Sequence, residues 1–487
     1  MAVRYDACVI GGDADGLAAA ATLAARGLKV VVVERDSHCG GRCATREFHP
    51  GFRASGFADE LPVIPSDIFW SLDLARRGAL FAPAQTSLAI WPDRQSVVLP
   101  ASQPPALASR TGVLRRAIIG RVMADAKTPP GRGWFKRRMP SLPWPGEELA
   151  GRSLRDLLGE ASANSAASLL AGRACDPTLA GSALELLAGP GGGMVAGGLG
   201  RLGDALRAAA EEAGAEISCG LEVSDIRCKG GHAVRVGLAD GSEIVARAVI
   251  STLDLKRTFL SLFTWSTLPR EVVDRAGAFR PAPATARLLL ALDAPPDPPA
   301  GTDSSALRAP IHVAPDAAAL EAAYRAWRGA TVPARPPAVL RLVSAVDPSL
   351  APEGAACMTV TLDAIPHTPF DGAWTREKRD KLRQTGLAAV EAVFPGLSKH
   401  VLGAELIVPP DMENMLGATG GDLSGGELAA DQMLGFRPFA VCRGTRTPVE
   451  GLYLAGPSST LGLLATCASG VAAARAVLAD FAAGRLR

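Results

Sequence analysis

The chain has 487 residues, of which 48% are hydrophobic and 21% are charged. A single hydrophobic core stops growing at about 250–300 residues, so a chain of this length is expected to form two lobes. Its 51 basic and 49 acidic residues leave a net charge of +2, which provides no general attraction to nucleic acid and excludes it as an expected partner.

The first fifty residues predict one βαβ unit. Residues 6–11 have the composition of a buried strand, and residues 17–26 form an Ala-rich helix that Gly27 ends. Residues 28–33 are a continuous apolar run, which is typical of a parallel strand covered on both faces. This order of elements is typical of the start of a nucleotide-binding fold.

A basic segment covers residues 115–138. Asp125 is its only acid, and Trp134 and Phe135 lie among its arginines and lysines. Two interpretations remain open. The segment is either a solvated loop broken by prolines, or a surface that binds an anionic membrane or a protein partner.

The middle and the end of the chain contain further helix-like and strand-like patterns. Helices are expected at 150–190 and 202–213, strands at 216–219, 223–228, 233–238 and 243–250, and Pro-rich loops at 281–310 and 330–337. A strand at 451–455 and a helix at 466–481 complete the chain. Elements typical of a nucleotide-binding fold therefore lie at both ends of the sequence. This arrangement predicts a cofactor domain assembled from both ends and the middle, with a second domain inserted.

The cysteines and histidines argue against a metal site. The nine cysteines are scattered without a Cys-x-x-Cys pair, and the six histidines show no metal-ligand spacing. Free thiols are typical of the reducing cytoplasm. The first residues lack the regions of a signal peptide, and no apolar stretch is long enough to span a membrane. We therefore expect a cytoplasmic protein that binds no metal.

A Gly-rich turn separates the first strand from the first helix. In the dinucleotide fingerprint Gly-x-Gly-x-x-Gly, the first glycine makes the tight turn, the second admits the pyrophosphate, and the third lets helix and strand pack closely. Gly11 and Gly16 occupy the first and third places, and Glu34 stands at the distance of the acid that binds ribose hydroxyls. The spacing predicts a nucleotide site. The alternative is a strand–turn–helix corner whose glycines serve packing alone.

Asp13 occupies the place of the second glycine. Its Cβ lies in the path of a pyrophosphate, and its carboxylate stands where a helix N-terminus would meet phosphate charge. Two like charges at contact distance repel each other, and more strongly where water is excluded. Asp13 therefore predicts that dinucleotide binding is weakened or altered.

Two runs after Glu34 carry a family resemblance. Cys-Gly-Gly-Arg-Cys at 39–43 and Glu-Phe-His-Pro-Gly-Phe at 47–52 resemble a segment of the flavin amine oxidase superfamily. They are most similar to its phytoene desaturase and carotenoid isomerase branch, and within that branch to the pyridine nucleotide-disulfide oxidoreductase domain-containing protein 2 type. The resemblance recurs at 197–202, 248–251, 419–422, 426–428 and 451–456, and it is loose between about 70 and 190.

The resemblance implies an α/β fold. A Rossmann-like FAD-binding domain would be assembled from the discontinuous segments 1–70, 190–265 and 440–487, and an inserted α+β substrate or cap domain from 71–189 and 266–439. FAD would lie extended from Glu34 to the turn after Gly456, with Arg42 near the pyrophosphate. The cofactor-binding residues expected from it are Gly11, Gly12, Asp13, Gly16, Glu34, Arg35, Gly40, Gly41, Arg42, Val223, Gly456 and Thr466. No catalytic residue is identified.

The turn after the last strand departs from the family pattern. In the family a Pro-Gly-Gly-Gly turn leads into a helix whose N-terminus faces the flavin and stabilises negative charge on it. Only Gly462 remains of the three glycines, and Leu463 and Leu464 are bulky enough to fill space that the flavin ring needs. Together with Asp13, these residues place FAD binding in doubt at both ends of the cofactor.

Two functions follow from the resemblance and its departures. The first is an FAD-dependent oxidoreductase of the dehydrogenase, desaturase or isomerase type that acts on an apolar small molecule. The alternative is a non-catalytic relative with weakened or lost FAD binding that serves as a binding or scaffold subunit. Either protein is expected in the cytoplasm, and peripheral to a membrane if residues 115–138 bind one.

Overall fold

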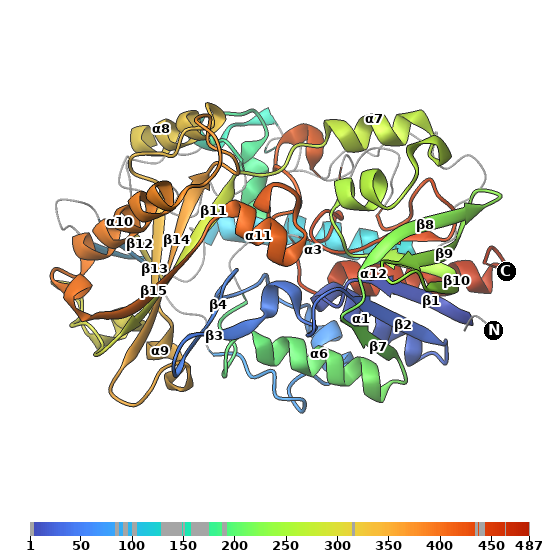
Figure 1. Ribbon diagram of the computed structural model, residues 1–487, viewed down its shortest axis with the longest axis horizontal. Helices are drawn as coiled ribbons and strands as arrows, with labels where there is room; N and C mark the ends of the chain where they lie inside the picture. Colours follow the sequence, from blue (N-terminus) through green and yellow to red (C-terminus); the bar gives the residue numbers. More distant parts are fainter. Residues whose placement is uncertain are drawn as a thin grey trace.

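Two lobes lie side by side in the computed structural model, and both chain ends are at the lobe on the right of Figure 1. The described residues are 4–82, 87–90, 96–99, 105–127, 149, 151–156, 175–187, 192–313, 317–433, 437, 444–462 and 464–486. The helices are α1 (Ala14–Ala24), α2 (Ser66–Ser71), α3 (Pro105–Ala126), α6 (Gly200–Glu212), α7 (Arg270–Ala278), α8 (Ala317–Arg328), α9 (Val343–Val346), α10 (Arg376–Val393), α11 (Pro409–Leu416) and α12 (Ala468–Ala482).

A seven-stranded sheet forms the centre of the right-hand lobe. Its strands are β1 (Arg4–Ile10), β2 (Val30–Glu34), β7 (Glu216–Cys219), β8 (Val223–Lys229), β9 (His232–Leu238), β10 (Glu243–Ser251) and β16 (Leu452–Leu454). Their order is β7-β2-β1-β10-β9-β8, and β16 pairs with β10. The pairs among β7, β2, β1, β10 and β16 are parallel, whereas β9 is antiparallel to both of its neighbours. The predicted α/β fold with a Rossmann-like unit built from separate segments is confirmed.

The central strands of this sheet, β1, β2 and β10, are buried on both faces. In β1, Ala7 and Val9 join a hydrophobic cluster with α1, α6 and α12, while Cys8 and Ile10 join a second cluster that includes α7. Such double burial explains why the parallel strands are continuous apolar runs. The small alanine side chains of α1 let it pack closely against both α6 and α12.

A second sheet forms the other lobe. Its order is β15-β11-β14-β13-β12-β5-β6, and its strands are β5 (Ser87–Ile90), β6 (Ser96–Leu99), β11 (Ala284–Leu292), β12 (Ile311–Val313), β13 (Ala338–Leu342), β14 (Ala356–Ile365) and β15 (Val401–Ile407). The prediction of a loop throughout 281–310 is wrong, because β11 pairs with both β14 and β15. The prolines that suggested a loop flank the strand, and Leu288 to Leu292 between them are fully buried.

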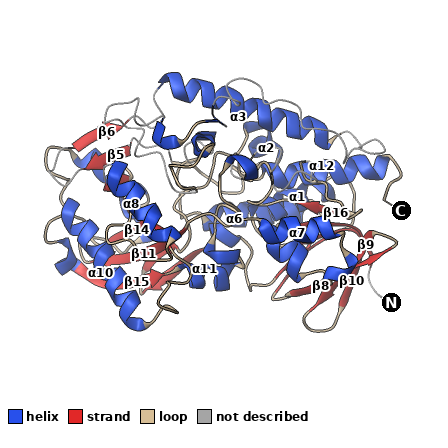
Figure 2. Cartoon of the chain, turned by 90° about the horizontal axis from the view of Figure 1, so that it is seen from above, coloured by secondary structure: helices blue, strands red, loops and turns tan. Residues whose placement is uncertain are grey.

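The first half of the basic segment is helical, so its interpretation as a solvated loop is wrong there. Residues 105–126 form α3, which lies along one side of the molecule in Figure 2. Leu114 and Met123 are buried in the same cluster as α12, and Arg446 donates a hydrogen bond to the carbonyl of Ala126 at 3.2 Å. Residues 128–138, with Trp134 and Phe135, lie outside the described residues. None of the described helices is long and apolar enough to cross a lipid bilayer.

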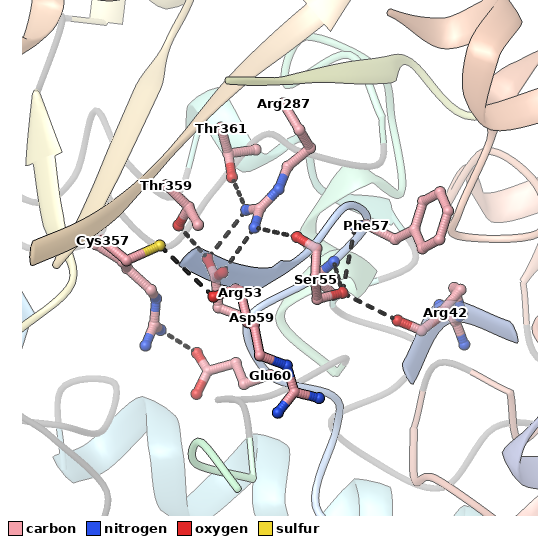
Figure 3. A network of polar contacts seen from close by, with 12 residues as sticks. Arg42, Arg53, Ser55, Phe57, Asp59, Glu60, Arg287, Cys357, Thr359 and Thr361 are labelled. Carbon is pink, nitrogen blue, oxygen red and sulfur yellow. Dashed lines mark hydrogen bonds and ion pairs between the residues drawn. The ribbon is translucent and has the colours of Figure 1, made fainter. Parts of the chain in front are cut away.

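A buried ion pair joins the second sheet to the N-terminal part of the chain (Figure 3). The hairpin of β3 (Thr45–His49) and β4 (Phe52–Ser55) leads to Asp59, whose carboxylate accepts two hydrogen bonds from Arg287 on β11, at 2.6 and 3.0 Å. Both side chains are less than 10% exposed. Thr359 donates to the same carboxylate at 2.9 Å, so the carboxylate is well satisfied despite its burial.

Candidate functional site

A groove of about 430 Å³ lies along the carboxyl ends of β1, β2 and β10. This edge of an open parallel sheet is where ligands bind in α/β proteins. Seven of the predicted site residues line the groove, namely Gly11, Asp13, Glu34, Arg35, Gly41, Arg42 and Val223. Five do not line it, namely Gly12, Gly16, Gly40, Gly456 and Thr466.

The glycines of the first turn allow three backbone segments to approach closely. Gly11 has φ of 103°, and a Cβ there would lie 2.2 Å from Oγ1 of Thr252, which follows β10. A Cβ on Gly16 would lie 2.0 Å from the carbonyl oxygen of Gly11. Neither position has space for a side chain, so both glycines are needed for helix and strand to pack.

Asp13 caps the helix that it precedes. Its Oδ1 accepts a hydrogen bond from the backbone N–H of Gly16 at 2.9 Å, and the residue lines the groove. Burial and the nearby Asp15 raise the pKa of Asp13 to about 7, although Gly16 and Arg42 oppose the rise. The first helix therefore carries a carboxyl group, which is an anion when ionised, at the place where a fingerprint glycine would leave room for phosphate.

Asp15 joins the N-termini of α1 and α12. Its buried carboxylate accepts a hydrogen bond from the backbone N–H of Gly470 at 3.0 Å. A Cβ on Gly470 would lie 1.9 Å from the carbonyl oxygen of Asp15, so the two segments are in direct contact. Burial raises the pKa of Asp15, while hydrogen bonds from Ser469 and Gly470 lower it.

Glu34 stands at one end of the groove. Its Oε2 accepts from the backbone N–H of Gly12 at 2.7 Å, and its Oε1 accepts from that of Asp36 at 2.9 Å. Burial raises the pKa of the carboxyl group. The neighbouring Arg35 donates to the carbonyl of Met415 at the end of α11, at 2.6 Å. These bonds fix the end of β2 in the position expected for an acid that binds ribose.

The segment after β2 forms the side of the groove opposite Thr252. Gly40 donates its N–H to the carbonyl of Gly12 at 2.8 Å. Gly41 has φ of 52°, and a Cβ there would lie 2.9 Å from the Cβ of Asp13. Arg42 donates to the carbonyl of Leu423 at 2.7 Å, and its positive charge acts on both Asp13 and Asp15. Arg42 is thus a groove cation that acts on both carboxylates of the first turn.

The far end of the groove is formed by the turn after β16. Pro457 and Ser458 line it, and Ser458 is 2% exposed. Within the described part of the chain, the Ser458 hydroxyl has no hydrogen-bond partner. This hydroxyl is enclosed by the protein, so Ser458 meets the groove through its other atoms.

Other residues of this turn point away from the groove. Thr466 is buried and donates to the carbonyl of Pro62 at 2.6 Å. Leu464 is buried in the hydrophobic cluster of α12 and does not line the groove. Leu463 lies outside the described residues. A Cβ on Gly456 would lie 2.4 Å from the carbonyl oxygen of Thr252, so this glycine serves the contact between β16 and β10.

Sequence reasoning missed several residues of the groove. Thr252, Asp254 and Arg257 follow β10, and Asp422 and Ser458 belong to later loops. The first three follow the strand predicted at 243–250, which the structure pairs in parallel with β1, so they reach the same edge. The loop residues carry no comparable signal. Among the described residues, no group of three or more acids, histidines or cysteines is arranged to hold a metal ion.

Two family profiles match the chain. Residues 9–59 match the NAD(P)-binding Rossmann-like domain, and residues 145–346 match the flavin containing amine oxidoreductase family. The predicted resemblance is confirmed: these parts of the chain are similar to the Rossmann-like domain and to the flavin containing amine oxidoreductases.

Individual proteins are also similar to this chain. The pyridine nucleotide-disulfide oxidoreductase domain-containing protein 2 of Rattus norvegicus is 27% identical, over 98% of this chain and 94% of its own length. The chloroplastic prolycopene isomerase of Daucus carota is 27% identical over 58% of this chain and 44% of its own length. A crystal structure of an oxidoreductase from Methanosarcina mazei has the same fold, with a TM-score of 0.59 and 19% identity over 99% of this chain and 100% of that one.

Proposed function

We propose that the protein is an active oxidoreductase that binds FAD in the groove and acts on an apolar small molecule. Glu34 would bind the ribose hydroxyls, Arg42 would approach the pyrophosphate, and the turn of Pro457 and Ser458 would contact the other end of the cofactor. The groove at the carboxyl ends of β1, β2 and β10 is the observation that carries the proposal, because it brings Gly11, Glu34 and Arg42 together at the edge where ligands bind in open parallel sheets.

Asp13 modifies this site without closing it. A carboxyl group with pKa raised to about 7 is partly protonated near neutral pH. The protonated form has no charge to repel phosphate and has an O–H that can donate to a phosphate oxygen. Meanwhile Oδ1 continues to cap the helix. The expected consequence is an FAD site that is weaker than a glycine would give and that strengthens in mild acid.

The apolar substrate is inferred from the relatives. Prolycopene isomerase is named for a carotenoid. The match between the two proteins covers 58% of this chain and 44% of that enzyme. Bound FAD would accept a hydride from such a substrate or return one to it. The chain's own contribution would be to orient the cofactor through Glu34, Arg42 and Ser458 and to exclude water. The reducing cytoplasm remains the proposed location, in accord with the free cysteines at all described positions.

A non-catalytic role is the second candidate, and Asp13 is the observation that favours it. If the carboxylate stays ionised beside a pyrophosphate, binding is weakened and the fold serves as a binding or scaffold subunit. Residues 115–138 would then be the first place to seek a protein partner or a membrane. Their outer part lies beyond the described residues, so this role rests on their charge alone.

Anaerobic reduction of the loaded protein separates the two candidates. The protein would be incubated with excess FAD, desalted, and mixed without oxygen with apolar polyenes and alcohols. An active oxidoreductase loses its flavin visible band with at least one of these substrates. Retention of FAD without reduction by any of them would favour the non-catalytic role.

A further inference from the structure

Arg437 is buried, with 2% of its surface exposed, and its guanidinium group bonds to backbone carbonyl oxygens. The acceptors are Ser424 at 2.7 Å, Gly425 at 2.9 Å, Gly426 at 3.5 Å, Pro457 at 2.8 Å and Ser459 at 3.2 Å. No carboxylate of the described residues forms an ion pair with it. Burial lowers the pKa of Arg437 to about 10, so the side chain is still charged at neutral pH.

These carbonyls belong to two loops that form one wall of the groove. Residues 424–426 follow Asp422, and residues 457–459 form the turn after β16. Gly425, Pro457 and Ser458 line the groove directly. The loops are in contact, because a Cβ on Gly425 would lie 2.5 Å from both the carbonyl carbon of Pro457 and the nitrogen of Ser458.

The N–H groups of the first loop are held from the other side by Asp422. Its carboxylate accepts from Ser424 at 2.7 Å, from Gly425 at 3.1 Å and from Gly426 at 2.6 Å. The same three residues therefore donate to a buried anion and accept from a buried cation. A guanidinium group suits this task, since its five donors are fixed in one plane and reach several carbonyls at once.

We propose that Arg437 is a positioning residue for the cofactor site, which holds the turn after β16 against residues 424–426 so that Pro457 and Ser458 stay at the groove wall. This role rests on the proposed FAD binding. Arg437 does not line the groove, so it acts through the backbone of residues 457–459 and not by contact with the ligand. A buried charge is costly unless it is fully hydrogen-bonded, and here its bonds go to the two loops that form the site.

The test compares three variants with the unmodified chain. R437M removes the donors, R437K keeps the charge with fewer donors, and R446M is the matched control. Arg446 is also buried and donates to Asp480 and to the carbonyl of Ala476, but it does not line the groove or bond to either of its loops. Each protein is titrated with FAD, and hydrogen exchange is followed in peptides that cover 422–426 and 457–459.

R437M should weaken FAD binding by roughly tenfold to a hundredfold, as expected when a supporting residue lets a ligand-binding group shift. R437K should recover part of the affinity, and R446M should bind FAD as the unmodified chain does even if it melts earlier. Exchange should rise in both peptides in R437M and R437K, and in neither peptide in R446M. If R437M does not fold, the test rests on R437K alone. R437K should then bind FAD more weakly than the unmodified chain and show faster hydrogen exchange in the same two peptides.

Two results would overturn the role, and they differ. If the unmodified chain binds FAD and R437M and R437K bind it equally well, Arg437 does not position the site, while the proposed function stands. If the unmodified chain does not bind FAD, the proposed function fails and this role fails with it, whatever the exchange measurements give.

Discussion

The carboxylate of Asp13 accepts a hydrogen bond from the backbone N–H of Gly16 at 2.9 Å, so the first helix is capped by a side chain at the groove itself. In a fingerprint turn that position is a glycine and the helix N-terminus is left to meet phosphate. Here the same N-terminus already has an anion when Asp13 is ionised. Because burial and Asp15 raise its pKa to about 7, the charge of this group changes near neutral pH.

Asn at position 13 is expected to strengthen FAD binding. D13N retains an oxygen that can cap the helix but removes the charge, and a like charge at contact distance costs about 1 kcal/mol or more, or roughly fivefold in affinity. Titration with FAD at pH 8 should therefore give a lower dissociation constant for D13N than for the unmodified chain. D13G should also bind more tightly, although it loses the cap.

The ionisation of Asp13 also predicts how FAD binding depends on pH. The unmodified chain should lose affinity as the pH rises through about 7, because Asp13 becomes ionised, and D13N should not show this step. Since the folded pKa lies above the ordinary value, the contribution of Asp13 to folding stability is also greatest in acid and is lost as the pH rises through about 7. Equal affinities of the two proteins at pH 6 and pH 8 would refute this account of the turn.

Ser458 lines the groove, but its hydroxyl is enclosed and has no partner among the described residues. S458A removes this hydroxyl, so thermal stability should stay the same or rise. FAD affinity should not change, because the enclosed hydroxyl cannot reach a molecule in the groove. Calorimetry and FAD titration of the same preparations measure both effects. A loss of stability would show that the hydroxyl serves the fold, and a loss of affinity would show that it reaches the ligand.

The buried pair of Asp59 and Arg287 is expected to stabilise the fold (Figure 3). D59N leaves the guanidinium charge buried without its counter-ion, and it should lower the free energy of unfolding by about 3–5 kcal/mol. D73N, which breaks an exposed pair with Arg76, is the matched control and should change stability little. Denaturant unfolding of the unmodified chain, D59N and D73N measures the free energy of unfolding of each protein. A similar loss of this free energy in D59N and D73N would contradict the prediction.

Acid should remove the contribution of Asp59. Burial opposes its ionisation, but the charge of Arg287 and its hydrogen bonds outweigh burial and lower the pKa of Asp59. A lowered folded pKa means that the stabilisation is present above the ordinary carboxyl pKa and is lost as the pH falls through the folded value. The stability deficit of D59N should therefore narrow below about pH 4. If the stability deficit of D59N does not change with pH, the loss comes from the changed shape of the side chain and not from its charge.

Gly16 is expected to tolerate no side chain. An alanine Cβ would lie 2.0 Å from the carbonyl oxygen of Gly11, and backbone on both sides would have to move. G16A should fold poorly or lose FAD binding. Gly120, in the exposed part of α3, has no atom within 4 Å of an added Cβ, so G120A should be stabilised by up to about 1 kcal/mol. Thermal melting of the two variants should move in opposite directions.

The sequence predicted the parts of the site that depend on local spacing. Gly11, Asp13 and Glu34 belong to one βαβ unit, so the fingerprint pattern alone brings them to one edge of the sheet. Ser458 lines the groove, and Arg437 bonds to the loops behind it. Both belong to segments whose path depends on tertiary contacts, so neither was predicted. Strand β11 was missed because the prolines around it were given more weight than the buried apolar run between them.

Asp59 and Arg287 illustrate another limit. They are separated by more than two hundred residues, and each is an ordinary charged residue in its local sequence. Only the pairing of β11 in the second sheet brings them together. The same holds for Cys39 and Cys219, whose sulfur atoms lie 3.6 Å apart although no motif connects them. Contacts of this kind follow from topology, which single-sequence patterns do not contain.

The central claim is that this groove binds FAD despite Asp13, and the most direct test is the visible spectrum of the purified full-length chain before and after incubation with excess FAD and desalting. The account predicts a flavin band in one-to-one ratio with protein at pH 6, with less FAD retained at pH 8. A folded protein that stays colourless at both values would contradict it.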